Sequence, residues 1–225
     1  MSHRWLVLRL EAPLMAFGGV AIDQVGPPRQ HPALSMLTGL MANALGWDWT
    51  DRAAHGTLQD RLLFGAATLR EGETVTDTQN VRMRGDDRGW TTRGAPEGRT
   101  GASYDAPHRR RRDFLADAAV RVVLRLQPPD EAPTLDDLAE ALDCPARPLF
   151  IGRKPCLPTA PVRATFLEAD TVHDALLALD LEAGTRAAWP QGEGPPGDRT
   201  IDLPDRRNWD SGLHGGTRRV HEGRL

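Results

Sequence analysis

The sequence predicts an α+β fold, in which a ferredoxin-like, RRM-type βαββαβ domain precedes a smaller C-terminal β-rich region. Strand-like apolar runs alternate with two segments of helical periodicity, in the order strand, helix, strand, strand, helix, strand. A long polar segment at about residues 72–112 interrupts this order and has no apolar period of its own. We therefore expect a domain over residues 1–158 with an insertion at 72–112, followed by a C-terminal region over residues 159–225.

The first expected elements are a buried strand and an amphipathic helix. Arg4–Leu10 is an apolar, strand-like run, and the turn-forming residues Pro13 and Gly18 follow it. Pro32 suits the first position of a helix, because an amide hydrogen is not needed there. Gly46 suits the end of the helix. One apolar stripe should face the sheet, and it consists of Leu34, Leu37, Met41, Ala44 and Leu45.

The other expected elements follow along the chain. Leu62–Leu69 and Ala118–Leu126 are strand candidates, Thr134 can cap a short helix, and Leu149–Ile151 is expected to be the fourth strand. The central strand lacks the aromatic motif of RRM domains, so we expect loops and the insertion, rather than the sheet face, to bind nucleic acid. The C-terminal region is expected to contain the strands Val162–Leu167 and Thr200–Leu203 and the short helix Val172–Leu179.

The net charge of −3 conceals one strongly basic segment. Between Arg82 and Arg112 there are nine arginines and four acidic residues. Such a local concentration of positive charge is typical of proteins that bind a polyanion. A solvated charged loop would have the same composition, and long insertions in compact domains are usually functional or disordered. Composition alone leaves both interpretations open, and we expect a long hairpin or loop that projects from the body.

Several classes of protein are not supported by the sequence. No apolar run approaches the roughly 20 residues of a membrane helix, and no signal-peptide pattern follows Met1–Arg4. The two cysteines, Cys144 and Cys156, do not make a disulfide framework, and no histidine pair has metal-ligand spacing. We expect a cytoplasmic protein that has no metal, no cofactor and no catalytic constellation.

Three blocks of the sequence resemble one family in their order and spacing. The first block begins with the strand Trp5–Leu10 and the turn Glu11–Gly18. It ends at Leu45 and Gly46, where the first expected helix stops. The second is Arg112–Ala118, and the third is Phe150–Pro158. Together they are similar to the CasD family, which belongs to the fifth Cas family of the RAMP superfamily. CasD subunits hold the 5′ handle of the guide RNA in Cascade, the type I-E CRISPR effector complex.

The resemblance implies a non-catalytic subunit that binds the 5′ handle of crRNA, caps the backbone filament of the complex and supports antiviral defence. The implied partners are crRNA, the CasC backbone subunits and the CasA large subunit. Target DNA would be reached indirectly through the complex, and no membrane is involved. In the family, the segment that matches residues 78–112 forms a thumb-like β-hairpin that clasps the RNA.

The predicted RNA-binding residues combine charge, stacking and close backbone approach. Arginines would neutralise phosphates, Trp90 and Tyr104 would stack on unpaired bases, and Gly152 would let the backbone approach a phosphate. Leu34 stands where the family has a basic residue, and Arg29 in the preceding loop is the nearest residue that could supply the missing charge. Ser35 and the backbone amides of the first helical turn should face the RNA. The full set is Arg29, Ser35, Arg82, Arg84, Arg88, Trp90, Arg93, Arg99, Tyr104, His108, Arg109, Arg110, Arg111, Arg112, Gly152, Arg153 and Lys154.

The residues leave two other functions open. Relatives in the type I-C branch cleave precursor RNA without a metal, so the chain is alternatively a metal-independent endoribonuclease that processes CRISPR repeat RNA. The candidate residues for that reaction would be Tyr104, His108 and Lys154. The third function is that of a plain RRM-like module with other RNA targets.

Overall fold

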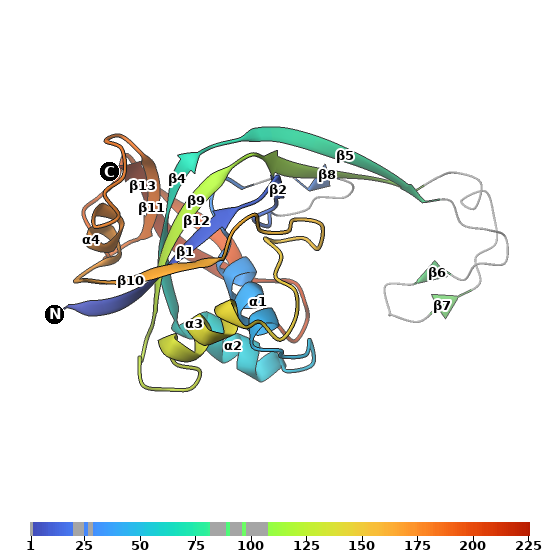
Figure 1. The fold of residues 1–225 in the computed structure, drawn as a ribbon. Helices are drawn as coiled ribbons and strands as arrows, with labels where there is room; N and C mark the ends of the chain where they lie inside the picture. The colour runs from blue at the N-terminus through green and yellow to red at the C-terminus, as the bar shows by residue number, and fades with distance from the viewer. Residues whose placement is uncertain (1, 20–24, 27–28, 82–88, 91–95, 98–107) are drawn as a thin grey trace.

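The computed structural model describes residues 2–19, 25–26, 29–81, 89–90, 96–97 and 108–225. They form a mixed α/β structure around a seven-stranded antiparallel sheet with the order β10-β1-β9-β4-β11-β13-β12 (Figure 1). The expected mixed α/β class is therefore confirmed. The strands of this sheet are β1 (His3–Glu11), β4 (Leu62–Arg70), β9 (Ala119–Leu126), β10 (Arg163–Ala169), β11 (Arg186–Pro190), β12 (Arg199–Arg207) and β13 (His214–Arg224).

Helices cover both faces of the sheet (Figure 1). On one face lie α1 (Leu34–Ala44), α2 (Arg52–Arg61) and α3 (Leu135–Asp143), and on the other lies α4 (Val172–Leu177). The alternation of side chains along β1 produces the two cores, because successive residues of a strand point to opposite faces. Leu6, Leu8 and Leu10 pack beneath the first three helices, whereas Trp5 and Val7 pack against α4.

Most of the expected elements are present, with shifted ends. The first helix begins at Leu34 rather than at Pro32, because Ala33 is extended, with a ψ of 148°. The expected apolar stripe of α1 is buried except for Leu45, which caps the helix and is half-buried. Gly46 follows with a φ of +79°. Thr134 caps α3 in a reciprocal capping box with Asp137. No helix within the described ranges is both long and apolar enough to cross a membrane.

The prediction of a fourth strand at Leu149–Ile151 is wrong. This segment enters a tight turn, in which the Ile151 amide donates to the Cys156 carbonyl at 2.8 Å and the Ile151 carbonyl accepts from Ala16 at 3.2 Å. Its apolar side chains pack onto the core without joining the sheet. The strand beside β1 is instead β10, from the segment that was expected in the C-terminal region. One sheet contains both β1, from the expected first domain, and β10–β13, from the expected C-terminal region. The strands of the two regions are therefore not in separate sheets, and the division of the chain after residue 158 stays a prediction.

A second, smaller sheet is built on β8 (His108–Ala116). Along its whole length β8 pairs with β5 (Glu73–Val81), and the pair continues β4 and β9 away from the main sheet (Figure 1). Gly72 lies between β4 and β5. Its φ is +73°, and an added Cβ would lie 2.3 Å from the Ala116 carbonyl oxygen, so only glycine fits at this position. The remaining short strands are β2 (Leu14–Met15) and β3 (Val25–Gly26), which pair with β8, and β6 (Gly89–Trp90) and β7 (Pro96–Glu97), which pair with each other.

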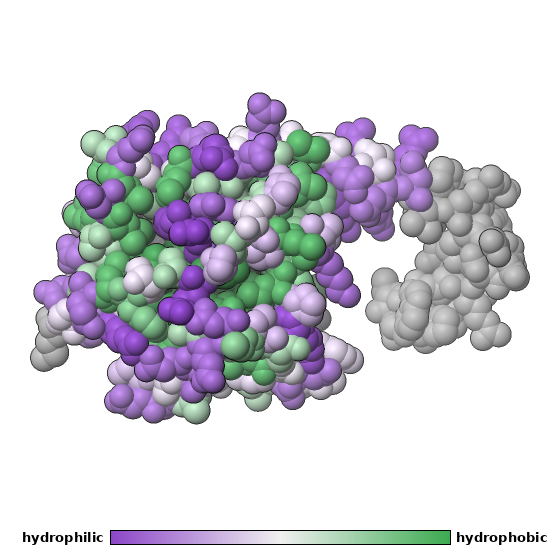
Figure 2. Space-filling model, viewed as in Figure 1, coloured by the Kyte–Doolittle hydropathy of each residue, from purple (hydrophilic) through white to green (hydrophobic). Residues whose placement is uncertain are grey.

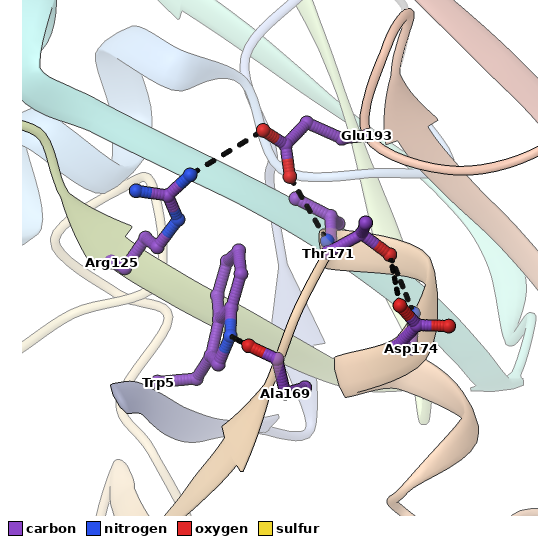
Figure 3. Close-up of polar contacts among 7 residues, drawn as sticks. Trp5, Arg125, Ala169, Thr171, Asp174 and Glu193 are labelled. Atoms are coloured by element: carbon purple, nitrogen blue, oxygen red, sulfur yellow. Dashed lines mark hydrogen bonds and ion pairs between the residues drawn. The ribbon is translucent and has the colours of Figure 1, made fainter. Parts of the chain in front are cut away.

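A partly buried ion pair connects the start of α4 to the sheet (Figure 3). Arg125 Nη2 lies 3.4 Å from Glu193 Oε1, and its guanidinium carbon lies 5.2 Å from the centroid of the Trp5 ring. The other carboxylate oxygen of Glu193 accepts from the Val172 amide at 3.1 Å, at the start of α4. These contacts close the sheet face beneath α4. The expectation that RNA is bound by loops and the insertion, rather than across the sheet face, is compatible with this arrangement.

Candidate nucleic-acid interface

The β5–β8 hairpin divides its run of arginines between two faces. Because side chains alternate along a strand, Arg110 and Arg112 share a face with Phe114, and Arg109 and Arg111 lie on the opposite face. Arg109, Arg110 and Arg111 are exposed, and Arg112 is half-buried. The described part of the hairpin is hydrophilic on the side shown in Figure 2, next to the body. Four adjacent arginines therefore make two charged surfaces.

The turn after Ile151 packs onto the first of these faces. Arg153 Nη1 donates to the Asp113 carbonyl at 3.1 Å, and its guanidinium carbon lies 4.7 Å from the centroid of the Phe114 ring. Burial lowers the pKa of Arg153, and the charge of Arg112 lowers it further. Arg153 therefore lies near Arg112, and two cations share one surface. We call Arg110, Arg112 and Arg153 the loop-side face, and Arg109 and Arg111 the opposite face.

The basic residues of this region differ from most arginines of the body in their partners. In the ranges that the structure describes, ten arginines of the body are ion-paired with carboxylates; they are Arg4, Arg61, Arg121, Arg125, Arg163, Arg186, Arg199, Arg206, Arg218 and Arg219. Among the described residues, no carboxylate forms an ion pair with Arg109–Arg112, Arg153 or the exposed Lys154. The charges of Asp77 and Asp113 also act on Arg153 and raise its pKa, but neither carboxylate forms an ion pair with it. A cluster of cations that outnumbers its neighbouring carboxylates and is not ion-paired is suited to bind the phosphates of a polyanion.

The start of α1 differs from the expectation. The Leu34 amide, which was expected to be free for RNA, donates to Asp205 Oδ2 at 3.1 Å, and Arg218 Nε donates to the same oxygen at 2.8 Å. Asp205 is fully buried. A carboxylate therefore already occupies the position at which a helix N-terminus attracts an anion. Leu34 is only 2% exposed and belongs to the core, so the position that is basic in the family does not face the solvent here.

Arg29 and Ser35 line one cleft beside this carboxylate. The cleft has a volume of about 380 Å³ and also contains Arg207 and His214. Arg29 Nη2 donates to the Pro204 carbonyl at 2.7 Å. Burial lowers the pKa of Arg29, and the charge of Asp205 partly opposes this effect. The Arg29 guanidinium thus holds the N-terminal loop against β12. Ser35, which lines the same cleft, is half-buried.

Gly152 has a packing role that is independent of any ligand. Its φ is +89°, and an added Cβ would lie 1.5 Å from the Ala16 carbonyl oxygen. Only glycine fits this approach of two backbones. The close contact that was predicted between Gly152 and a phosphate stays a prediction, because the fold alone already requires glycine at this position.

The other predicted contacts are only partly described. Arg82, Arg84, Arg88, Arg93, Arg99 and Tyr104 lie outside the described residues. The backbone of Trp90 lies in β6, and the backbone of His108 begins β8 opposite Val81. In the described parts of the chain, no group of histidine, cysteine, aspartate and glutamate residues is arranged to hold a metal ion. The structure adds Asp205, which sequence reasoning missed because its partners lie far away in the chain.

Comparisons with known proteins agree on one family. The model of a family described as CRISPR-associated protein (Cas_Cas5) matches residues 5–221. The CRISPR system Cascade subunit CasD of Escherichia coli (strain K12) is 28% identical over 180 residues, which cover 80% of this chain and 79% of CasD.

Two solved structures share the fold. A chain of a CRISPR RNA-guided surveillance complex superposes with a TM-score of 0.69 at 21% identity, covering 98% of this chain and 90% of that one. A Cas protein crystal structure superposes with a TM-score of 0.61 at 23% identity, covering 98% and 94%.

Proposed function

Since this chain belongs to the Cas5 family of CRISPR-associated proteins, we propose that it is a non-catalytic subunit of a type I-E surveillance complex, Cascade. In that role it binds the 5′ handle of crRNA and caps the backbone filament, in support of antiviral defence. The observation that carries the proposal is the cluster of unpaired cations on β8 and the turn after Ile151. Binding of RNA phosphates by such cations releases counterions and is therefore favourable at low salt.

The fold supports the same proposal. In the proposal, the strands β10-β1-β9-β4 are the sheet of a ferredoxin-like βαββαβ domain, with α1 and α3 as its crossovers and α2 as an addition after α1. In the proposal, the β5–β8 hairpin is the base of a thumb that clasps RNA. The partners are crRNA, the CasC backbone subunits and the CasA large subunit, and target DNA is reached through the complex. The relative named a Cascade subunit supports a place among the subunits of that complex, and the proposal places the protein in the cytoplasm.

The proposed RNA contacts lie mainly on the loop-side face, because Arg153 adds to its charge. Replacing Arg110 and Arg112 with alanine is expected to weaken binding of handle RNA about tenfold or more at low salt. The magnitude of the negative slope of log K against log salt should fall by about 1.4, because two phosphate contacts, each contributing about 0.7, are lost. Filter retention at a series of salt concentrations measures both quantities.

The chain offers a matched control for this pair. Replacing Arg109 and Arg111 with alanine removes the same charge from the same strand, but on the opposite face. We expect the smaller effect from this variant. Equal losses from the two variants would contradict a specific face, and unchanged slopes in both would show that the arginine run is a solvated surface.

The proposed role does not include catalysis. Cleavage of RNA needs general acid and base groups that reach the 2′-hydroxyl and the leaving oxygen, and the proposal assigns no residue to either task. Purified protein is expected to leave CRISPR repeat RNA intact over hours in the presence of EDTA, as measured on denaturing gels. A discrete cut at the handle boundary, lost in His108→Ala, would instead support the metal-independent endoribonuclease.

A further inference from the structure

The two most exposed large apolar side chains of the described chain lie on neighbouring turns. Trp49 precedes α2, the helix at the lower edge of the body in Figure 1, and is 74% exposed. Leu213 lies between β12 and β13 and is 71% exposed. Arg52 links them, since its guanidinium carbon lies 5.6 Å from the centroid of the Trp49 ring and its Nη1 donates to the Asp210 carbonyl at 3.2 Å. We call Trp49, Arg52, Arg207 and Leu213 the Trp49 surface.

Hydrogen bonds hold both turns in one conformation. In the first turn, the Asp48 amide donates to Asp51 Oδ2 at 2.7 Å, and the Asp51 amide donates to the Asp48 carbonyl at 3.0 Å. In the second turn, Asn208 Oδ1 accepts from the Asp210 and Ser211 amides, each at 3.0 Å. A surface fixed before binding loses little conformational entropy when a partner docks.

Stacked rings support the Trp49 surface from below. The His55 ring lies 5.6 Å from that of Trp47 and 4.5 Å from that of Trp209, measured between centroids. Arg207 covers the Trp209 ring, with 5.2 Å from its guanidinium carbon to the centroid. His55 is only 6% exposed, so α2 and the β12–β13 turn form one packed unit. Trp49 and Leu213 are therefore exposed on two turns that the packed rings beneath them hold in place.

The charges around the Trp49 surface argue against RNA as its occupant. Asp48, Asp51 and Asp210 are exposed on the two turns, and three carboxylates repel a polyanion. Arg52 and Arg207 have no ion pair with a carboxylate in the part of the chain that the structure describes. Such a surface, with exposed apolar side chains, free guanidinium groups and charges of both signs, is complementary to a protein. Tryptophan and arginine are also the residues that contribute most often to binding energy at protein interfaces.

We propose that the Trp49 surface docks a second protein subunit, which offers an apolar pocket for the Trp49 indole and carboxylates for Arg52 and Arg207. This inference rests on the proposed function, because it takes the partner from the other protein subunits of the same complex. It concerns a different surface from the hairpin, which carries the main RNA contacts of the proposal, although Arg207 and Leu213 also line the cleft that contains Arg29 and Ser35. Loss of docking and loss of RNA binding are therefore separable.

The test uses the full chain with Trp49 and Leu213 both replaced by alanine. Binding to purified CasC and to purified CasA is measured by biolayer interferometry, and binding to handle RNA is measured separately. We expect at least a tenfold loss of affinity for one of the two subunits, with RNA affinity and melting temperature unchanged. Leu177→Ala is the control, because Leu177 is 50% exposed on α4, which covers the other face of the sheet. Arg52→Glu, which leaves both apolar side chains in place, should weaken the same binding.

Other results would overturn the inference. Unchanged affinity of the double variant for both subunits, or no binding of either subunit by the wild-type chain, would exclude this docking surface. A loss of RNA affinity with subunit binding intact would mean that Trp49 stacks on a base. If the wild-type chain failed to bind RNA while the double variant lost subunit binding, the proposed RNA role would fall and the docking surface would stand.

Discussion

Asp205→Ala is expected to lower the free energy of unfolding by about 3–5 kcal/mol, because it leaves a buried charge without its partner. Asp205 is fully buried, accepts from the Leu34 amide and is ion-paired with Arg218 at 2.8 Å. Burial already lowers the pKa of Arg218, and the Asp205 charge opposes that effect. Removing the carboxylate therefore leaves a desolvated guanidinium and an unsatisfied amide at the start of α1. Urea denaturation followed by circular dichroism measures the loss.

Asp202→Ala is the matched control for this prediction. Asp202 lies on the same strand and is ion-paired with Arg219 at 3.0 Å, but both side chains are more than half exposed. An exposed ion pair contributes about 1 kcal/mol at most. Similar losses in the two variants would mean that Asp205 does not hold the C-terminal strands to α1.

Gly152→Ala is expected to destabilise the protein by about 2–5 kcal/mol, from the left-handed backbone and the steric overlap together. The new Cβ would lie 1.5 Å from the Ala16 carbonyl oxygen, so one of two backbones must move. The affected turn carries Arg153 and contacts β8, and the variant should therefore also bind RNA more weakly. Thermal denaturation measures the effect on stability.

Gly192→Ala separates the two contributions. Gly192 has the same φ of +89°, but an added Cβ there meets nothing within 4 Å. Only the cost of the left-handed backbone, about 1–2 kcal/mol, should remain. If Gly152→Ala were as stable as the wild-type protein and yet lost RNA binding, the glycine would be required by the RNA and not by Ala16.

Elements with a clear apolar period could be predicted from the sequence. The stripe of α1 and the apolar runs of β1 and β9 are properties of neighbouring residues, so local patterns indicate them. The helix α2 was missed because its sequence contains a single leucine, and its packing comes from Trp209, far away in the chain. The strand β13 was missed because glycines and charged residues replace the apolar alternation.

The candidate site was predictable in composition but not in geometry. The arginine run and the Gly-Arg-Lys turn were identified from sequence, whereas the packing of Arg153 on Phe114, which defines the loop-side face, depends on the fold. The contact between Leu34 and Asp205 joins residues 171 positions apart. No local signal distinguishes such an aspartate from an exposed one, and this is why free amides were expected at the start of α1.

The central claim is that the unpaired cations of the hairpin and its neighbouring turn bind the phosphates of the crRNA handle. The most direct test is the equilibrium affinity of the wild-type chain for handle RNA, measured over a series of salt concentrations against a scrambled RNA of equal length. We predict that log K falls linearly with log salt, with a slope of roughly −0.7 for each phosphate contact, and that the handle binds more tightly than the scrambled RNA. No measurable binding at low salt, or an affinity that does not change with salt, would contradict the account.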